Sequence, residues 1–214
     1  MKQAVGADLA ALFKSVPVIP VLVIENASDA VPMARALVNG GLKVLEITLR
    51  TAAALTAVTA VREAVPGALV GVGSVIDTSQ FSSSQAAGAQ FAVSPGANAD
   101  LLAAARDSSL PWLPGAQTVS EVLALRSSGY RFLKFFPAHA SGGVNFLRAI
   151  RGPVPDMMFC PTGGISEATA PQYLALPNVG CVGGSWLTPD TLVASRDWHG
   201  VEQLARTAAG LPRG

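Results

Sequence analysis

Residues 42–73, LKVLEITLRTAAALTAVTAVREAVPGALVGVG, contain the pattern that decides the fold. Residues 42–49 and 68–73 are apolar runs of strand length, whereas residues 52–65 are rich in alanine and repeat apolar side chains at helical spacing. Pro66 and Gly67 separate the helix from the second strand. This order predicts one βαβ unit with parallel strands.

The same alternation extends along the chain. Strand-like runs cover residues 17–24, 42–49, 68–73, 90–94, 111–114, 132–136, 158–162 and 179–183. Helical patterns cover residues 1–15, 28–39, 52–65, 78–87, 98–107, 118–128, 143–151 and 166–176, with a last helical tail at 188–210. Eight strands at intervals of about 20–25 residues predict an α/β fold, a (β/α)8 TIM barrel with an N-terminal helix, formed by one domain over residues 1–214.

An open doubly wound sheet is the alternative topology. It usually carries a glycine-rich turn after its first strand, whereas Glu25-Asn26-Ala27 stands at that point. Prolines inside several runs blur the strand boundaries, because proline donates no hydrogen bond to a sheet. They are Pro17, Pro20, Pro111, Pro114 and Pro161.

Composition excludes several classes of partner. A net charge of +1 without runs of one sign gives no reason to expect nucleic acid or an anionic membrane. Charged residues make up 14% of the chain against about 25% in typical globular proteins, which favours an oligomer. We find neither an apolar span of membrane length nor a secretory signal. Cys160 and Cys181 are expected to be buried free thiols and not a disulfide. Free thiols fit a reducing cytoplasm.

Lys134 is the first candidate for chemistry. It is one of four lysines and interrupts the run Phe132-Leu133-Lys134-Phe135-Phe136. Strand alternation puts Phe132, Lys134 and Phe136 on one face. Inside a barrel a lysine loses solvation, which disfavours the ammonium form and leaves an amine nucleophile. A lysine that extends out of the barrel end, or that only pairs with a carboxylate, is the structural alternative.

The run of residues 44–50 favours the functional interpretation. Leu45, Ile47 and Leu49 form an apolar face for the helices, so Glu46 and Arg50 should face the interior. There they approach the carboxyl ends of the strands, where barrel active sites lie. A Glu46–Arg50 or Glu46–Lys134 ion pair that only neutralises buried charge remains the alternative.

Two glycine pairs follow the last two predicted strands. Gly163-Gly164 ends the seventh, and Gly183-Gly184-Ser185 ends the eighth, the two loops where barrels often bind phosphate. Ser74 could bind a substrate oxygen at the end of the third strand. A metal site is not expected, because His139 and His199 are the only histidines and no carboxylate cluster accompanies them.

Together these segments resemble the 2-keto-3-deoxy-6-phosphogluconate (KDPG) aldolase family along nearly the full chain. The motifs are Val44-Leu45-Glu46-Ile47-Thr48-Leu49-Arg50-Thr51, Val72-Gly73-Ser74-Val75, Ser94-Pro95-Gly96, Lys134-Phe135-Phe136-Pro137-Ala138, Cys160-Pro161-Thr162-Gly163-Gly164-Ile165 and Gly183-Gly184-Ser185-Trp186-Leu187. The resemblance implies a cytoplasmic, homotrimeric class I aldolase of the Entner–Doudoroff pathway. Such a lyase needs no cofactor and cleaves KDPG to pyruvate and glyceraldehyde 3-phosphate.

The resemblance also implies residue roles. Lys134 becomes the Schiff-base lysine, Glu46 the acid–base that works partly through water, and Arg50 the ligand of the pyruvate carboxylate. The other implied substrate contacts are Ser74, Pro95, Phe136, Thr162, Gly163, Gly164, Gly184 and Ser185. Many relatives have threonine where this chain has Ser74, and His139 receives no role.

Two alternative functions remain at this stage. One is a related pyruvate aldolase that acts on 4-hydroxy-2-oxoglutarate or on 2-keto-3-deoxy-6-phosphogalactonate. The other, from a different class, is a non-catalytic sugar-phosphate binding protein. The joint presence of Lys134, Glu46 and Arg50 argues against the binding protein.

Overall fold

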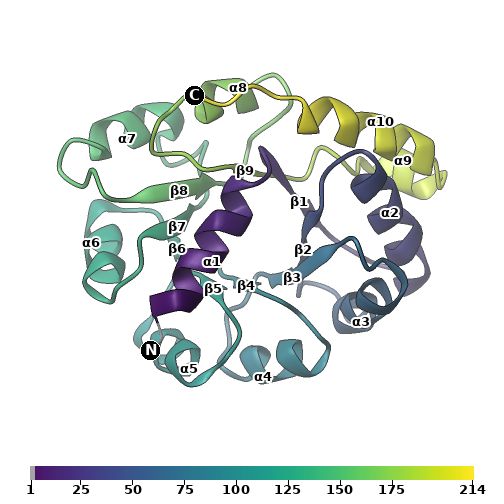
Figure 1. The fold of residues 1–214 in the computed structure, drawn as a ribbon, viewed down its shortest axis with the longest axis horizontal. Helices are drawn as coiled ribbons and strands as arrows, with labels where there is room; N and C mark the ends of the chain where they lie inside the picture. The colour runs from purple at the N-terminus through teal and green to yellow at the C-terminus, as the bar shows by residue number, and fades with distance from the viewer. Residues whose placement is uncertain (1–2) are drawn as a thin grey trace.

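The computed structural model describes residues 3–214, so Met1 and Lys2 of the expected first helix lie outside the described residues. Within this range helices and parallel strands alternate, which confirms the α/β prediction (Figure 1). The strands are β1 Val18–Leu22, β2 Val44–Thr48, β3 Leu69–Gly73, β4 Ala92–Val93, β5 Trp112–Leu113, β6 Gly115–Ala116, β7 Phe132–Phe135, β8 Met158–Pro161 and β9 Val182–Gly184. The helices are α1 Gln3–Lys14, α2 Ala27–Asn39, α3 Ala54–Ala64, α4 Ser79–Ala86, α5 Ala99–Asp107, α6 Val119–Ser127, α7 Gly143–Ile150, α8 Ala170–Leu174, α9 Asp190–Ala194 and α10 Trp198–Ala209.

The strands form a curled parallel sheet in two parts. One part has six strands in the order β5-β4-β3-β2-β1-β9, and the other has three in the order β6-β7-β8. Single parallel bridges, Phe159 with Val179 and Thr162 with Gly183, lie between β8 and the β9 region. The predicted strand at residues 111–114 corresponds to β5, and β6 follows immediately after Pro114, which has no N–H to donate.

The two faces of the strands have separate cores. Leu45, Ile47, Leu133 and Phe135 point outward into the core shared with the helices. The inward face carries a second group, called here the interior cluster: Leu9, Phe13, Val16, Ile19, Val44, Phe91, Val93, Leu113, Phe132, Cys160 and Cys181. Strand alternation therefore has the phase that the sequence predicts for residues 44–50. In residues 132–136 Phe132 lies on the opposite face from Leu133 and Phe135, as predicted, and the structure shows that its face is the inner one.

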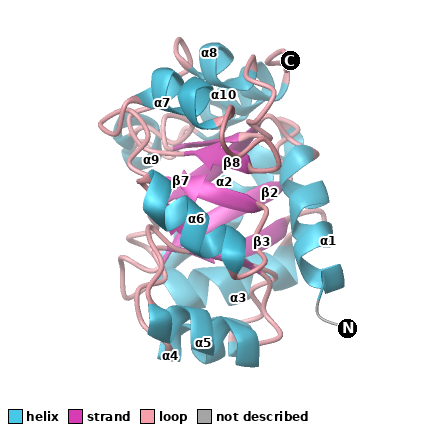
Figure 2. Ribbon diagram, turned by 90° about the vertical axis from the view of Figure 1, so that its left-hand side faces the viewer, coloured by secondary structure: helices cyan, strands magenta, loops and turns pink. Residues whose placement is uncertain are grey.

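Helix α1 closes the amino ends of the strands. Figure 1 shows it across the front of the strands, and Figure 2 shows it along one side of them. Phe13 is fully buried, and its ring centroid lies 5.1 Å from that of Phe91 and 5.8 Å from that of Phe132. Because Phe132 begins β7 and Val44 begins β2, this contact lies at the strand starts. The carboxyl ends, on the opposite side, are left for a site.

Several helices begin where a polar side chain satisfies free backbone N–H groups. Asn26 and Asn98 accept from the first turns of α2 and α5, and Thr118 forms a capping box with Glu121 at α6. Helix α8 is shorter than the predicted 166–176, because residues 166–169 form a turn in which Ser166 N donates to Thr169 Oγ1 at 2.9 Å. No helix within residues 3–214 has the length and apolarity to cross a membrane.

Candidate active site

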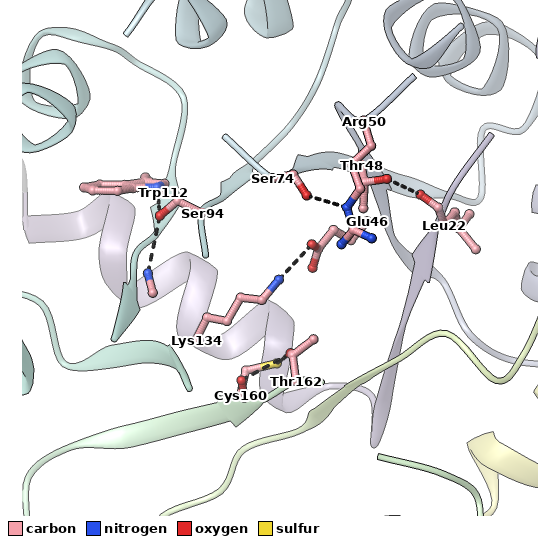
Figure 3. A network of polar contacts seen from close by, with 11 residues as sticks. Leu22, Glu46, Thr48, Arg50, Ser74, Ser94, Trp112, Lys134, Cys160 and Thr162 are labelled. Atoms are coloured by element: carbon pink, nitrogen blue, oxygen red, sulfur yellow. Dashed lines mark hydrogen bonds and ion pairs between the residues drawn. The ribbon is translucent and has the colours of Figure 1, made fainter. Parts of the chain in front are cut away.

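Lys134 and Glu46 form a buried pair between β7 and β2. Lys134 Nζ donates to Glu46 Oε1 at 3.1 Å, and both residues are only 3% exposed (Figure 3). Of the pairs considered from the sequence, Glu46 therefore has Lys134 as its partner and not Arg50. The hydrogen bond gives a proton of the lysine a direct path to the carboxylate. Such a pair is costly to bury, so a contribution to the stability of the fold is a weak explanation for its presence.

The strands around the pair fix its position. Thr48 on β2 donates from Oγ1 to the Leu22 carbonyl at 2.9 Å and ties β2 to β1. Lys134 lies in register with Gly115 on one side and Cys160 on the other. The Phe136 ring centroid lies 5.4 Å from Lys134 Nζ, close enough for a cation–π contact. These contacts restrict the position of Lys134 in addition to its hydrogen bond with Glu46.

Arg50 lies just beyond the carboxyl end of β2 and is exposed. Its Nε donates to Ser74 Oγ at 3.0 Å, and Ser74 adopts a positive φ of 59° after β3. A positive φ is uncommon for a residue other than glycine and often accompanies a functional constraint. In Figure 3 Arg50 and Ser74 lie at the Glu46 end of the Lys134–Glu46 pair. Arg50 therefore presents its guanidinium donors at the carboxyl ends of β2 and β3, fixed in part by Ser74.

Pro95 follows β4 and lies against β6. A Cβ atom built on Gly115 would lie 2.6 Å from the Ser94 carbonyl oxygen and closer still to the Pro95 carbonyl group. Ser94 Oγ accepts from Trp112 Nε1 at 3.1 Å and from the Gly115 N–H at 3.3 Å, which holds this turn in place. Since Gly115 is the register partner of Lys134, Pro95 lies one strand away from the amine.

The two glycine pairs differ in structure. Gly163 and Gly164 have φ angles of 99° and 73°, as an exposed turn after β8 requires. Gly183 and Gly184 instead belong to β9, are buried and have no positive φ. Their missing side chains leave room for Thr162 and for the Trp186 ring, respectively. Backbone angles that favour glycine therefore occur only in the first pair.

Two surface clefts lie beside these loops. The first, of about 630 Å³, lies at α7 and α8 and includes His139, whose backbone N–H donates to the Gly163 carbonyl at 3.0 Å. The second, of about 470 Å³, includes the exposed Ser185 together with the acidic Glu25 and Asp190. Neither is lined by Lys134 or Glu46. The Lys134–Glu46 pair therefore lies apart from both clefts, buried among the strands.

Cys160 and Cys181 are free thiols in the interior cluster, as expected. Burial raises the pKa of the Cys181 thiol well above its usual value, and Cys160 adds to this. Within residues 3–214 no group of three or more His, Cys, Asp or Glu residues is arranged to hold a metal ion.

A lysine amine held against a carboxylate inside the strands of an α/β protein is an arrangement suited to enzymes that use an amine nucleophile. The chain is a member of the KDPG and KHG aldolase family, whose model matches residues 9–204.

Individual relatives agree with this family. A protein of Pseudoalteromonas atlantica named 2-dehydro-3-deoxy-phosphogluconate aldolase is 49% identical over 197 residues, which is 92% of each chain. The KDPG aldolase of Legionella pneumophila, solved with pyruvate captured as a covalent carbinolamine intermediate, is 45% identical with a TM-score of 0.91 and covers 94% of this chain and 98% of its own. The Zymomonas mobilis enzyme, solved with 3-phosphoglycerate, is 41% identical with a TM-score of 0.91 and covers 98% of each chain.

Sequence reasoning missed the contribution of Gly73. A Cβ atom at this position would lie 2.6 Å from Cγ and 2.7 Å from Cδ of Glu46, and closer still to Oε1. The available signal was the pair Gly71 and Gly73, two residues apart and therefore on one face of β3. Glycine inside a strand often marks a close approach by another group.

Proposed function

We propose that this chain is a class I aldolase that cleaves 2-keto-3-deoxy-6-phosphogluconate to pyruvate and glyceraldehyde 3-phosphate through a Schiff base on Lys134. The observation that carries the proposal is the buried Lys134–Glu46 pair with its 3.1 Å separation, in a chain of the KDPG and KHG aldolase family. The pyruvate adduct in the Legionella pneumophila relative supports covalent chemistry of this kind.

The reaction follows from the position of the two groups. The Lys134 amine attacks the keto carbon, and loss of water leaves a protonated imine. Glu46 takes the proton of the alcohol as the adjacent carbon–carbon bond breaks, and the bonding electrons move to the imine to form an enamine. Return of the proton to the enamine carbon gives the pyruvate imine, which water hydrolyses. Glyceraldehyde 3-phosphate leaves as the aldehyde.

The remaining site residues divide between the two halves of the substrate. Arg50 and Ser74 hold the carboxylate, since the guanidinium offers two parallel donors. Pro95 and Phe136 shape the pocket beside Lys134. The phosphate and hydroxyl groups bind at Thr162, Gly163, Gly164, Gly184 and Ser185, and the 3-phosphoglycerate in the Zymomonas mobilis relative supports a phosphorylated ligand.

For the whole molecule we propose one domain that closes as a (β/α)8 barrel. Bridges between β8 and the β9 region, and the single residue Pro114 between β5 and β6, support closure with β5 and β6 as one interrupted strand. The low charge content supports an oligomer. The family resemblance supports a homotrimer and a cytoplasmic enzyme of the Entner–Doudoroff pathway.

Borohydride reduction in the presence of pyruvate tests the mechanism. We expect one three-carbon unit per chain, attached at Lys134, and no effect of metal chelators on turnover. Attachment at another lysine, or activity restored by a divalent metal after chelation, contradicts a class I mechanism. Pyruvate release from the phosphogluconate and phosphogalactonate substrates, and from 4-hydroxy-2-oxoglutarate, distinguishes the proposed substrate from its alternatives. The relatives' names favour the first.

A further inference from the structure

Strand β3 places two glycines on the inward face, Gly71 and Gly73. Both are buried in a regular strand, and neither has a positive φ. Conformational freedom therefore does not explain them, because any residue adopts these backbone angles. What distinguishes the two positions is the side chain that occupies the space in front of each.

The space in front of Gly73 belongs to Glu46. Glu46 is in register with Gly71, but its side chain extends toward the carboxyl ends of the strands and crosses Gly73 on the neighbouring strand. Its Cγ and Cδ lie 2.6 and 2.7 Å from the place of a Cβ atom at residue 73, distances that real Cβ contacts do not show. Glu46 could not have its present conformation beside any other residue.

The space in front of Gly71 belongs to Phe91. A Cβ atom there would lie 2.5 Å from Cγ of the Phe91 ring and closer to two other ring atoms. Phe91 stacks edge-on against Phe13 of α1 and belongs to the interior cluster. Gly71 therefore serves the packing at the amino ends of the strands, two residues away from a glycine that faces the Lys134–Glu46 pair.

We propose that Gly73 is a positioning residue for the reaction, because its missing side chain holds open the space that brings the Glu46 carboxylate to Lys134. The inference rests on the proposed role of Glu46 as the acid–base. It assigns no contact between Gly73 and substrate. It makes the 3.1 Å distance between Lys134 Nζ and Glu46 Oε1 depend on residue 73.

An alanine at residue 73 displaces Glu46 before it displaces the strand. The atoms that block the new methyl group belong to a flexible side chain, whereas β3 is held by β2 and β4 on both sides. Glu46 is only 3% exposed, so its carboxylate has no open space beside its present position. A displaced Glu46 side chain therefore moves away from Lys134. A shift of about 1 Å in a catalytic group costs roughly 10²-fold in rate.

The test compares Gly73→Ala with its matched control Gly71→Ala. For Gly73→Ala we expect kcat for cleavage to fall by roughly 10²-fold. KM should stay within about twofold of wild type, because Arg50 and Ser74 are retained. The melting temperature should fall less than in Gly71→Ala, because a flexible side chain gives way instead of a packed ring. The rate of borohydride trapping at Lys134 should fall with kcat. For Gly71→Ala we expect the reverse, with a melting temperature lower by roughly 2–12 °C from overpacking against Phe91 and a nearly normal kcat per folded molecule.

A second pair of variants separates this inference from the function on which it rests. If Gly73 acts through Glu46, adding Gly73→Ala to Glu46→Gln should reduce kcat by no more than about twofold further, because the base is already absent. An equal loss in both backgrounds overturns the positioning role. A Gly73→Ala variant with wild-type kcat also overturns it. The same holds for a Gly73→Ala variant whose kcat falls while its melting temperature drops as far as that of Gly71→Ala. Normal turnover of Glu46→Gln alone instead contradicts the proposed function.

Discussion

The amino and carboxyl ends of the same strands have opposite characters. At the amino ends Phe91 and Phe132 pack against Phe13 of α1, and Val44 belongs to the same apolar cluster. Two residues further along β2 and β7 stand Glu46 and Lys134. A strand rises about 3.3 Å per residue, so the change from packing to candidate chemistry takes about 7 Å.

The comparison shows how the molecule tolerates a buried ion pair. Removing two charges from water costs several kcal/mol, and one hydrogen bond between them offsets this only partly. Apolar burial at the amino ends stabilises the same strands by about 1.5–3 kcal/mol for each large side chain. The two ends should therefore respond differently to substitution, with rate affected at one and stability at the other.

The largest expected effect is that of Lys134→Met at the carboxyl ends. It keeps an unbranched side chain but removes the amine, so cleavage and the three-carbon adduct should both disappear. Mass spectrometry after borohydride treatment with pyruvate measures the adduct. Lys43→Met, at an exposed lysine just before β2, is the control and should retain full labelling. An adduct that persists in Lys134→Met places the nucleophile elsewhere.

Glu46→Gln keeps the shape of the side chain and removes the base. Turnover should fall by roughly 10²–10⁴, as for the loss of general acid–base catalysis. The rate of Schiff-base trapping should fall as well, because the loss of water also needs proton transfer. Steady-state kinetics and timed borohydride quenching measure both rates. Turnover near wild type would leave Glu46 as a structural partner of Lys134.

Phe13→Ala tests the opposite end. Phe13 is fully buried against Phe91 and Phe132, so the free energy of unfolding should fall by about 3–5 kcal/mol. Urea denaturation measures this loss, and kcat per folded molecule should remain close to wild type. Ala11→Ser, on the exposed side of α1, should change stability by less than about 0.5 kcal/mol. A Phe13→Ala protein with intact stability but poor turnover would contradict the division between the ends.

Ser185→Ala tests the phosphate loops with less disturbance than a glycine substitution. Gly163 needs its positive φ, and a side chain at Gly184 would collide with the Trp186 ring, whereas Ser185 is exposed. Loss of one charge-assisted hydrogen bond should raise KM for the phosphorylated substrate by roughly ten- to hundredfold. A non-phosphorylated keto acid is the control. An equal effect on both substrates moves the phosphate site elsewhere.

The smallest expected effect is that of iodoacetamide on the interior thiols. Burial raises the pKa of Cys181, so the reactive thiolate is scarce near pH 8. Cys160 is buried beside it in the interior cluster. Mass spectrometry should find neither residue alkylated in the folded protein and both alkylated after denaturation. Rapid labelling of Cys181 in the folded protein would mean that the amino ends are open to solvent.

Strand alternation predicted the inward face of β2 correctly from the sequence. Leu45, Ile47 and Leu49 formed an apolar outer face, so the inward direction of Glu46 was predictable. For β7 the alternation showed only which residues share a face with Lys134, because both faces are apolar apart from it. Helix starts were predictable for a similar reason, since Asn26, Asn98 and Thr118 are local signals. Both inferences depend on residues near one another in the chain.

Contacts between distant segments could not be predicted in this way. The sequence left open whether Glu46 would pair with Arg50 or Lys134, because the answer depends on how β2 and β7 face each other across the interior. It also treated Gly184 as a loop residue, whereas the residue belongs to β9 and makes room for Trp186. Neither fact has a local signal in the sequence.

The closure of the amino ends by α1 also sets an order of events during synthesis. Phe13 leaves the ribosome before most of the other residues of the interior cluster. These include Phe91, Phe132 and, just before the last strand, Cys181. About 170 residues separate Phe13 from Cys181, and at roughly 5–20 residues per second their synthesis takes about 10–30 s. Arg213 then donates to the Lys14 carbonyl from near the end of the sequence. Helix α1 is therefore made long before its complete set of neighbours exists.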